Sequence, residues 1–253
     1  MPIALITGTT SGIGEATAQL LAAQGYNLII NGRRLDKLEV QAAELSDKYG
    51  ISTHLMHLDV RDADAVTDFF TSLPEAWQNI DVVVNNAGLA AGLDNIENGS
   101  IDDWNRMIDT NIKGLLYVTK SAIPLLKQTK GHIVNVGSIA GKEVYPNGNV
   151  YCGTKHMVDA LNKAMRRELA ESGIRVSAVH PGAVETEFSL VRLEGDTVKA
   201  ASVYEGFENL VAQDIADAIG YIISRPKHVN INELIIMPTA QPAAGVILRN
   251  QGL

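Results

Sequence analysis

A tyrosine and a lysine stand four residues apart in the segment NVYCGTKHM, as Tyr151 and Lys155. If the segment is helical, the two side chains lie on one face, one turn apart. An ammonium near a phenol stabilises the ionised form, so the tyrosine could exchange protons well below its ordinary pKa of about 10. The pair therefore predicts an acid/base group. Because such a pair also arises by chance, the rest of the chain has to supply the context.

Seven short apolar runs predict β-strands, and longer amphipathic segments lie between them. The strand candidates are IALIT, NLII, THLMHL, DVVVN, HIVNV, RVSAV and ELIIM. The helix candidates are EATAQLLAAQ, LDKLEVQAAELSDKY, ADAVTDFF, the stretches 101–128 and 150–171, and AQDIADAIGYII. Strands that alternate with helices favour right-handed crossovers and a parallel sheet covered on both faces. The sequence thus predicts an α/β fold, a Rossmann-type doubly wound parallel sheet of seven strands.

A single domain over 1–253 is the simplest organisation, because no linker or charge block divides the chain. The connection over 181–204 is longer than an ordinary turn and follows the sixth strand candidate, at the edge where such sheets bind ligands. We expect it to cover a substrate. The tail over 238–253 is apolar but interrupted by proline and glycine. It docks on another subunit or, alternatively, is disordered.

Charge and composition exclude several classes of protein. The net charge of −8 argues against nonspecific electrostatic binding to nucleic acid or to an anionic membrane, since both need concentrated Lys and Arg. Cys152 is the only cysteine, which excludes an intramolecular disulfide and a cysteine zinc cluster and fits a reducing compartment. The N-terminus has no basic leader, and no apolar run approaches the roughly 18 residues of a membrane helix. We expect a soluble, cytoplasmic protein without a metal site.

The first strand candidate leads into TGTTSGIGEA, where Gly8, Gly12 and Gly14 lie between a strand and a helix. Glycines there permit a tight turn and close backbone approach, and a helix N-terminus attracts phosphate. The spacing is not the usual G-x-G-x-x-G, and the lysine of a Walker loop is missing. A glycine turn that serves only packing remains an alternative. The strand-before-helix context favours a site for the pyrophosphate of a dinucleotide.

Two arginines, Arg33 and Arg34, follow the second strand candidate in the sequence NGRR. A carboxylate at this place binds the ribose 2′-OH of NAD, whereas arginine accommodates a 2′-phosphate. The arginines favour NADP(H), although a solvated pair at a helix start is the alternative. The residues that follow the third and fourth strands face the same crevice, and their position suggests adenine and ribose contacts: Asp59, Asn85, Asn86, Ala87 and Gly88.

Five motifs in this order resemble the short-chain dehydrogenase/reductase family over essentially the whole chain. They are TGTTSGIG, NNAG, Ser138, Tyr151-x-x-x-Lys155, and Pro181 with Gly182. The resemblance implies that Tyr151 is the general acid/base and that Lys155 lowers its pKa and holds the nicotinamide ribose. It also implies that Ser138 orients the substrate oxygen, that Asn111 supports a proton-relay water, and that Thr186 contacts the nicotinamide amide. The full set of implied cofactor contacts is Gly8, Thr10, Ser11, Gly12, Ile13, Gly14, Arg33, Arg34, Asp59, Val60, Asn85, Ala87, Gly88, Tyr151, Lys155, Pro181, Gly182, Val184 and Thr186.

Longer stretches are similar to the NADP-dependent 3-hydroxy acid dehydrogenases, which oxidise L-allo-threonine, serine and 3-hydroxyisobutyrate. They are LPEAWQNIDVVVNNAGLAAG, DDWNRMIDTNIKG, GNVYCGTK, ETEFSLVRLEGD and HVNINELIIMPTAQ. The implied reaction is reversible oxidation of the hydroxyl to the 3-oxo acid by hydride transfer. A sulfoacetaldehyde reductase, working on isethionate, is the nearest alternative, and a non-catalytic NADP(H)-binding sensor is an alternative of another class. A 3-oxoacyl-carrier-protein reductase fits less well, since ELIIMPTAQPAAG lacks that group's usual Asn-Gly-Gly ending.

A carboxylate substrate in an anionic protein needs a dedicated cation, and Arg192 in the 181–204 connection is our candidate. A solvated loop arginine is the alternative. Lys142 and Arg249 are further candidates, the latter from a neighbouring subunit. The resemblance also implies a homotetramer in which the helices 101–128 and 150–171 pack across a two-fold axis.

Overall fold

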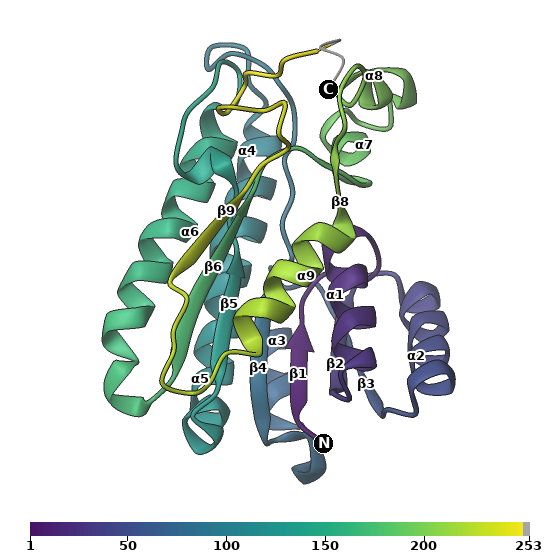
Figure 1. Ribbon diagram of the computed structural model, residues 1–253, viewed down its shortest axis with the longest axis vertical. Coiled ribbons are helices and arrows are strands. Elements are labelled where there is room, and N and C mark those ends of the chain that lie inside the picture. Colours follow the sequence, from purple (N-terminus) through teal and green to yellow (C-terminus); the bar gives the residue numbers. More distant parts are fainter. Residues whose placement is uncertain (250–253) are drawn as a thin grey trace.

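The computed structural model describes residues 1–249 and has a seven-stranded sheet at its centre (Figure 1). The strand order is β3-β2-β1-β4-β5-β6-β9, and every neighbouring pair is parallel. The strands are β1 (Ile3–Ile6), β2 (Asn27–Gly32), β3 (Thr53–His57), β4 (Ile80–Asn85), β5 (His132–Val136), β6 (Arg175–Pro181) and β9 (Glu233–Ile236). All seven strand candidates are confirmed, and with them the Rossmann-type doubly wound fold.

Helices cover both faces of the sheet, which is why inner strands such as β1 and β5 are buried at every residue rather than at alternate ones. Packed on one face are α3 (Ala63–Thr71), α5 (Leu115–Thr129) and α6 (Asn149–Glu168). Packed on the other are α1 (Gly12–Ala23), α2 (Leu35–Tyr49) and α9 (Ala212–Ile223). Single turns of 3₁₀ helix occur at Glu75–Trp77, Ile139–Gly141 and Ala170–Ser172. Within the described residues, no helix is both long and apolar enough to cross a membrane.

The stretch predicted as one helix over 101–128 is divided in the structure. It consists of α4 (Ile101–Ile108), a π-helical turn (Asp109–Gly114) and α5. Ser100 caps α4 as its sequence suggests, because its side chain accepts a hydrogen bond from the backbone N–H of Asp103 at 3.3 Å. π-helical turns are rare in proteins, and those that occur are often found at functional sites. This one contains Asn111.

The long connection predicted after β6 is ordered rather than a plain loop. It contains β7 (Val184–Glu185), α7 (Phe188–Arg192) and α8 (Thr197–Ser202), and β7 pairs in parallel with β8 (Leu210–Val211). The hydroxyl of Tyr204 binds the carbonyl of Val184 at 3.0 Å and the hydroxyl of Ser189 at 2.6 Å. We call residues 184–204 the insertion segment. Figure 1 shows it beyond the carboxyl ends of the central strands.

The C-terminal tail is ordered over 238–249 and folds back on its own chain. The Gln241 side-chain oxygen accepts a hydrogen bond from the backbone N–H of Ala183 at 2.7 Å, and the N–H of Ala244 donates to Glu143 at 2.8 Å. The alternative of a disordered tail is therefore wrong for these residues. The rest of the predicted tail, 250–253, lies outside the described residues.

Candidate active site

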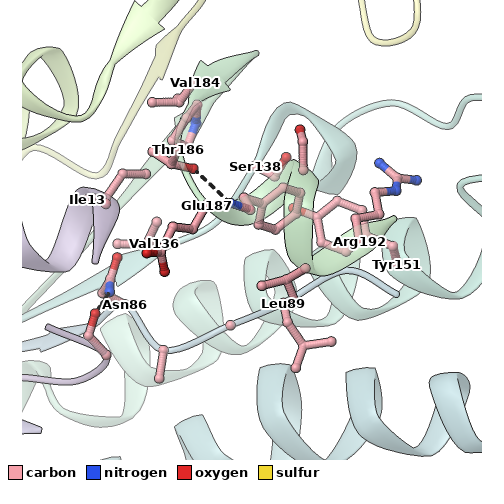
Figure 2. Close-up of a pocket in the computed structure, with 18 of the residues that line it drawn as sticks. Ile13, Asn86, Leu89, Val136, Ser138, Tyr151, Val184, Thr186, Glu187 and Arg192 are labelled. Atoms are coloured by element: carbon pink, nitrogen blue, oxygen red, sulfur yellow. Dashed lines mark hydrogen bonds between the residues drawn. The ribbon is translucent and has the colours of Figure 1, made fainter. Parts of the chain in front are cut away.

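A cavity of about 580 Å³ lies where β1, β2, β4, β5 and β6 end, bounded by the insertion segment and the tail. Its size is that of an ordinary ligand site. Of the predicted cofactor contacts, those that line it are Gly8, Thr10, Ser11, Gly12, Ile13, Arg33, Arg34, Asp59, Val60, Ala87, Gly88, Tyr151, Lys155, Pro181, Gly182, Val184 and Thr186. Ser138 and Arg192 line the same cavity. Figure 2 shows the part of it around Tyr151.

The glycine loop between β1 and α1 forms a cradle that larger residues could not build. Gly8 and Gly12 have positive φ angles of 70° and 59°. A Cβ atom at Gly14 would lie only 2.2 Å from the carbonyl oxygen of Gly8. The side-chain amide of Asn86 ties the loop to β4 by donating to the carbonyls of Thr7 and Gly8. The cradle leaves the N-terminus of α1 open to the cavity, which fits a pyrophosphate.

Both arginines after β2 line the cavity, and each is already paired with a carboxylate. Arg33 lies 3.6 Å from Asp59, and Arg34 lies 3.2 Å from Glu187. Arg34 also donates to the hydroxyl and the carbonyl oxygen of Thr10, at 2.9 and 3.0 Å. A pair of guanidinium groups beside the glycine loop is the arrangement expected for a 2′-phosphate.

Asn85 does not face the cavity, contrary to its prediction as a cofactor contact. It is buried, and its amide donates to the Thr119 hydroxyl and to the Asn135 side-chain oxygen, both at 2.9 Å. Its neighbour Asn86 lines the cavity instead. Successive residues of a strand point to opposite sides, so only one of the two asparagines can face the ligand.

Tyr151 lies on α6 and is 8% exposed, with its ring edge-on to Phe188. Burial raises the pKa of its phenol well above the ordinary value, and nearby Tyr145 adds to the rise. A hydrogen bond with Ser138 and the charge of Arg192 act in the opposite direction. The predicted lowering of the pKa is therefore not found, and the phenol keeps its proton at neutral pH.

Lys155 is on the same face of α6 as Tyr151, as its spacing predicts, but its ammonium points past the phenol. The ammonium donates to the carbonyl of Val136 at 3.0 Å and lies 6.0 Å from the centre of the Tyr151 ring. Burial lowers the pKa of Lys155 to about 8. A Cβ atom at Gly88 would lie 3.2 Å from the side-chain oxygen of Asn111, which is a tight contact, and 3.5 Å from this ammonium.

Asn111, in the π-helical turn, uses its whole side-chain amide on the protein. It donates to the Leu89 carbonyl at 2.8 Å and to the Thr154 hydroxyl at 3.0 Å, and it accepts from the Leu89 N–H at 2.8 Å. The side chain thus fixes the segment that follows NNAG against α6. Its implied support of a relay water stays a prediction.

Arg192, the last residue of α7, reaches the end of the cavity near Tyr151 (Figure 2). Its guanidinium donates to the Tyr145 hydroxyl at 3.0 Å and to the Gly92 carbonyl at 3.3 Å. Among the described residues, its buried Nη2 has no hydrogen-bond partner. A buried donor without a partner is uncommon and indicates a place for a ligand acceptor.

The two other candidate anchors are engaged elsewhere. The ammonium of Lys142 lies 2.8 Å from Asp159 and 2.5 Å from Glu233, and the residue does not line the cavity. The prediction that Lys142 could anchor the substrate is wrong, because these carboxylates already neutralise it. Arg249 binds its own chain, at the carbonyls of Ser202, Val203 and Glu205.

The cavity also contains residues that were not predicted from the sequence as site residues, among them the polar Tyr145, Glu187 and Gln241. Glu187 directly follows Thr186, so its neighbour in the motif could have signalled it. Tyr145 and Gln241 reach the cavity only through tertiary contacts, with Arg192 and with Ala183. No local pattern marks them.

Comparisons with known proteins find similar dehydrogenases over nearly the whole chain. Among curated relatives, the NADP-dependent 3-hydroxy acid dehydrogenase YdfG of Escherichia coli (strain K12) is 41% identical over 251 residues, which cover 98% of this chain and 100% of the relative. Serine 3-dehydrogenase of Agrobacterium fabrum is 42% identical, with 95% of each chain covered. The closed form of serine dehydrogenase complexed with NADP⁺ superposes with a TM-score of 0.91 at 41% identity, covering 98% of this chain and 100% of that one.

A second solved structure, serine dehydrogenase from Escherichia coli, has a TM-score of 0.81 at 37% identity and covers 94% of this chain and 99% of its own. The family model described as short chain dehydrogenase matches residues 2–195, from the first strand into the insertion segment. That range contains the glycine loop, Ser138, Tyr151 and Lys155. The chain belongs to the short-chain dehydrogenase family.

Proposed function

We propose that the protein is an NADP-dependent oxidoreductase that reversibly oxidises the hydroxyl group of small 3-hydroxy acids to the 3-oxo acid. L-allo-Threonine, serine and 3-hydroxyisobutyrate are the candidate substrates. One observation carries the proposal: a single cavity joins a glycine cradle and two arginines to the Tyr151–Ser138 pair and to the unpaired guanidinium nitrogen of Arg192. The relatives named as 3-hydroxy acid and serine dehydrogenases support this substrate class.

NADP(H) is held by the groups at the ends of β1, β2 and β4. The glycine loop receives the pyrophosphate, and Arg33 and Arg34 receive the 2′-phosphate. Lys155 lies at the cavity wall, where its ammonium holds the nicotinamide ribose. When bound, the nicotinamide supplies the hydride acceptor or donor.

Tyr151 exchanges the proton of the substrate oxygen. In the reducing direction its neutral phenol donates a proton to the carbonyl oxygen, and the raised pKa means that this proton is present at neutral pH. Ser138 holds the same oxygen by its hydroxyl. In the oxidising direction the phenolate is the acceptor and needs positive charge nearby, which Lys155 carries below its pKa of about 8.

Arg192 binds the substrate carboxylate through its free Nη2, while its other nitrogens stay on Tyr145 and Gly92. A carboxylate that accepts from a buried guanidinium forms a strong charge-assisted hydrogen bond. The insertion segment, which carries Arg192, covers the substrate. Apolar side chains of Leu89 and Phe188 border the same end of the cavity and suit a short carbon chain.

The test follows the absorbance of NADPH formed from NADP⁺ with L-allo-threonine, L-serine, 3-hydroxyisobutyrate and isethionate, with Tyr151→Phe as the control. We expect turnover of the hydroxy acids and its loss in the variant. Turnover of isethionate alone would instead identify a sulfonate enzyme. Tight NADPH binding without turnover of any of the four would favour the sensor.

We also propose that the protein is a cytoplasmic homotetramer. Its only cysteine, Cys152, is a buried free thiol and suits a reducing compartment. Apolar side chains are exposed on the helices expected at the subunit contacts, namely Ile101 and Ile108 on α4 and Met157 on α6. Light scattering that gives a monomer of 27.2 kDa would contradict the assembly.

A further inference from the structure

Glu187, the first residue before α7, places a carboxylate on the cofactor side of the cavity. In Figure 2 it lies towards Ile13 and Asn86, whereas Arg192 at the other end of α7 lies near Tyr151. The carboxylate is 3.2 Å from the guanidinium of Arg34 and 3.5 Å from the ammonium of Lys37.

The carboxylate of Glu187 is an anion under the conditions of catalysis. Partial burial tends to raise its pKa, but the charge of Arg34, a hydrogen bond with Ser11 and the charge of Lys37 together lower it. Arg34 belongs to the site proposed for the 2′-phosphate, and Ser11 belongs to the glycine loop. A side chain of the protein therefore already occupies the donors that a cofactor phosphate needs.

We propose that Glu187 is a specificity-determining residue for the cofactor: an internal anion that holds Arg34 and is displaced by the phosphate of NADP(H). The proposal rests on the proposed NADP function of Arg34. A cofactor with a 2′-phosphate has to take Arg34 from Glu187, and binding is weaker by the free energy of that exchange. A cofactor without the phosphate leaves the Arg34–Glu187 pair in place.

The opposing interpretation is an ordinary surface ion pair. The side chains of Arg34 and Glu187 are 41% and 46% exposed, and pairs of this kind contribute little to stability. The two interpretations differ in what they predict for ligands. A surface pair has no effect on cofactor affinity, whereas a competing anion lowers the affinity of NADPH selectively.

The experiment measures equilibrium binding of NADPH and of NADH by nicotinamide fluorescence, without substrate, for the wild-type protein and for Glu187→Gln. The amide keeps the size of the side chain and removes its charge. We expect Glu187→Gln to bind NADPH about tenfold more tightly, the effect of losing one charge-assisted contact, and NADH with nearly unchanged affinity. Glu185→Gln is the matched control, because Glu185 lies two residues away, is exposed and does not line the cavity, and its carboxylate accepts a hydrogen bond from the Asn209 amide at 3.5 Å.

A double-mutant cycle with Arg34→Gln locates the effect. In the Arg34→Gln background, Glu187→Gln should no longer increase the affinity for NADPH, since the two residues act through one contact. Unchanged or weaker NADPH binding in Glu187→Gln would overturn the inference, as would equal tightening of NADPH and NADH. If the wild-type protein binds neither cofactor, the proposed function itself fails; if it binds NADPH and Glu187→Gln does not alter the affinity, only the role of Glu187 fails.

Discussion

The cofactor half and the substrate half of the cavity are built in different ways. The cofactor half consists of the short turns that end β1, β2 and β4, and local glycines such as Gly8 and Gly12, with their positive φ angles, give the first turn its shape. The substrate half depends on contacts between distant segments. Arg192 binds Gly92 across 100 residues and Tyr145 across 47. The same fold can therefore keep one cofactor while its substrate changes.

The largest effect should come from the residue that does chemistry. Tyr151→Phe removes the exchangeable proton and should lower kcat about 10³-fold, within the range for loss of a general acid. NADPH binding, measured by fluorescence, should stay within about twofold, because the ring still packs on Phe188. Tyr221→Phe, on the exposed side of α9 and away from the cavity, is the control and should retain the rate. Loss of NADPH binding in Tyr151→Phe would show that the two halves are not separable.

Lys155 lies between the halves, and its burial should make the fold less stable. Its pKa of about 8 is below the unfolded value of about 10.5, so between these pH values the unfolded chain binds more protons and wild-type stability rises with pH. Lys155→Met removes the buried charge and should be more stable by up to about 3 kcal/mol below pH 8. The advantage should vanish above about pH 10.5. Urea unfolding of both proteins across this window measures it, and a pH-independent difference would contradict the buried ammonium.

Arg192 tests the substrate half alone. Arg192→Met should raise the KM for the 3-hydroxy acid about 30-fold, the effect of one lost hydrogen bond between charged groups. The KM for NADP⁺ should not change. Arg192→Lys keeps the charge but not the forked geometry, so its KM for the hydroxy acid should lie between those of the wild type and Arg192→Met. A change confined to the KM for NADP⁺ would show that Arg192 contacts the cofactor and not the substrate.

Arg33 tests the cofactor half with the smallest expected effect. Arg33→Gln should lower the affinity for NADPH about tenfold, since one of the two cations for the 2′-phosphate is lost while Arg34 remains. NADH affinity and the KM for the hydroxy acid should stay as they are. Titration calorimetry with both cofactors provides the comparison, and an equal loss for NADPH and NADH would place Arg33 away from the 2′-phosphate.

Features that depend on neighbouring residues can be predicted from the sequence, whereas features that depend on contacts between distant segments cannot. The seven strands and the glycine loop are predictable because apolar periodicity and glycine positions are local properties. The choice between Asn85 and Asn86 is not, because it depends on which side of β4 meets the cavity. The engagement of Lys142 is not predictable either, because its partners Asp159 and Glu233 lie 17 and 91 residues away. Tyr145 and Gln241 also reach the cavity only through contacts between distant segments.

The π-helical turn at Asp109–Gly114 makes the position of Asn111 depend on the exact number of residues between α4 and α5. Such a turn holds one residue more than an α-helical turn, so it amounts to a single-residue insertion between α4 and α5. Deleting one residue there would let the two helices join as one continuous α-helix with its hydrogen bonds intact. The side chains on one side of the deletion would turn by about 100° relative to the other, and the Asn111 amide would leave Leu89. A chain that is one residue shorter would thus keep its helices but lose the alignment of its active site.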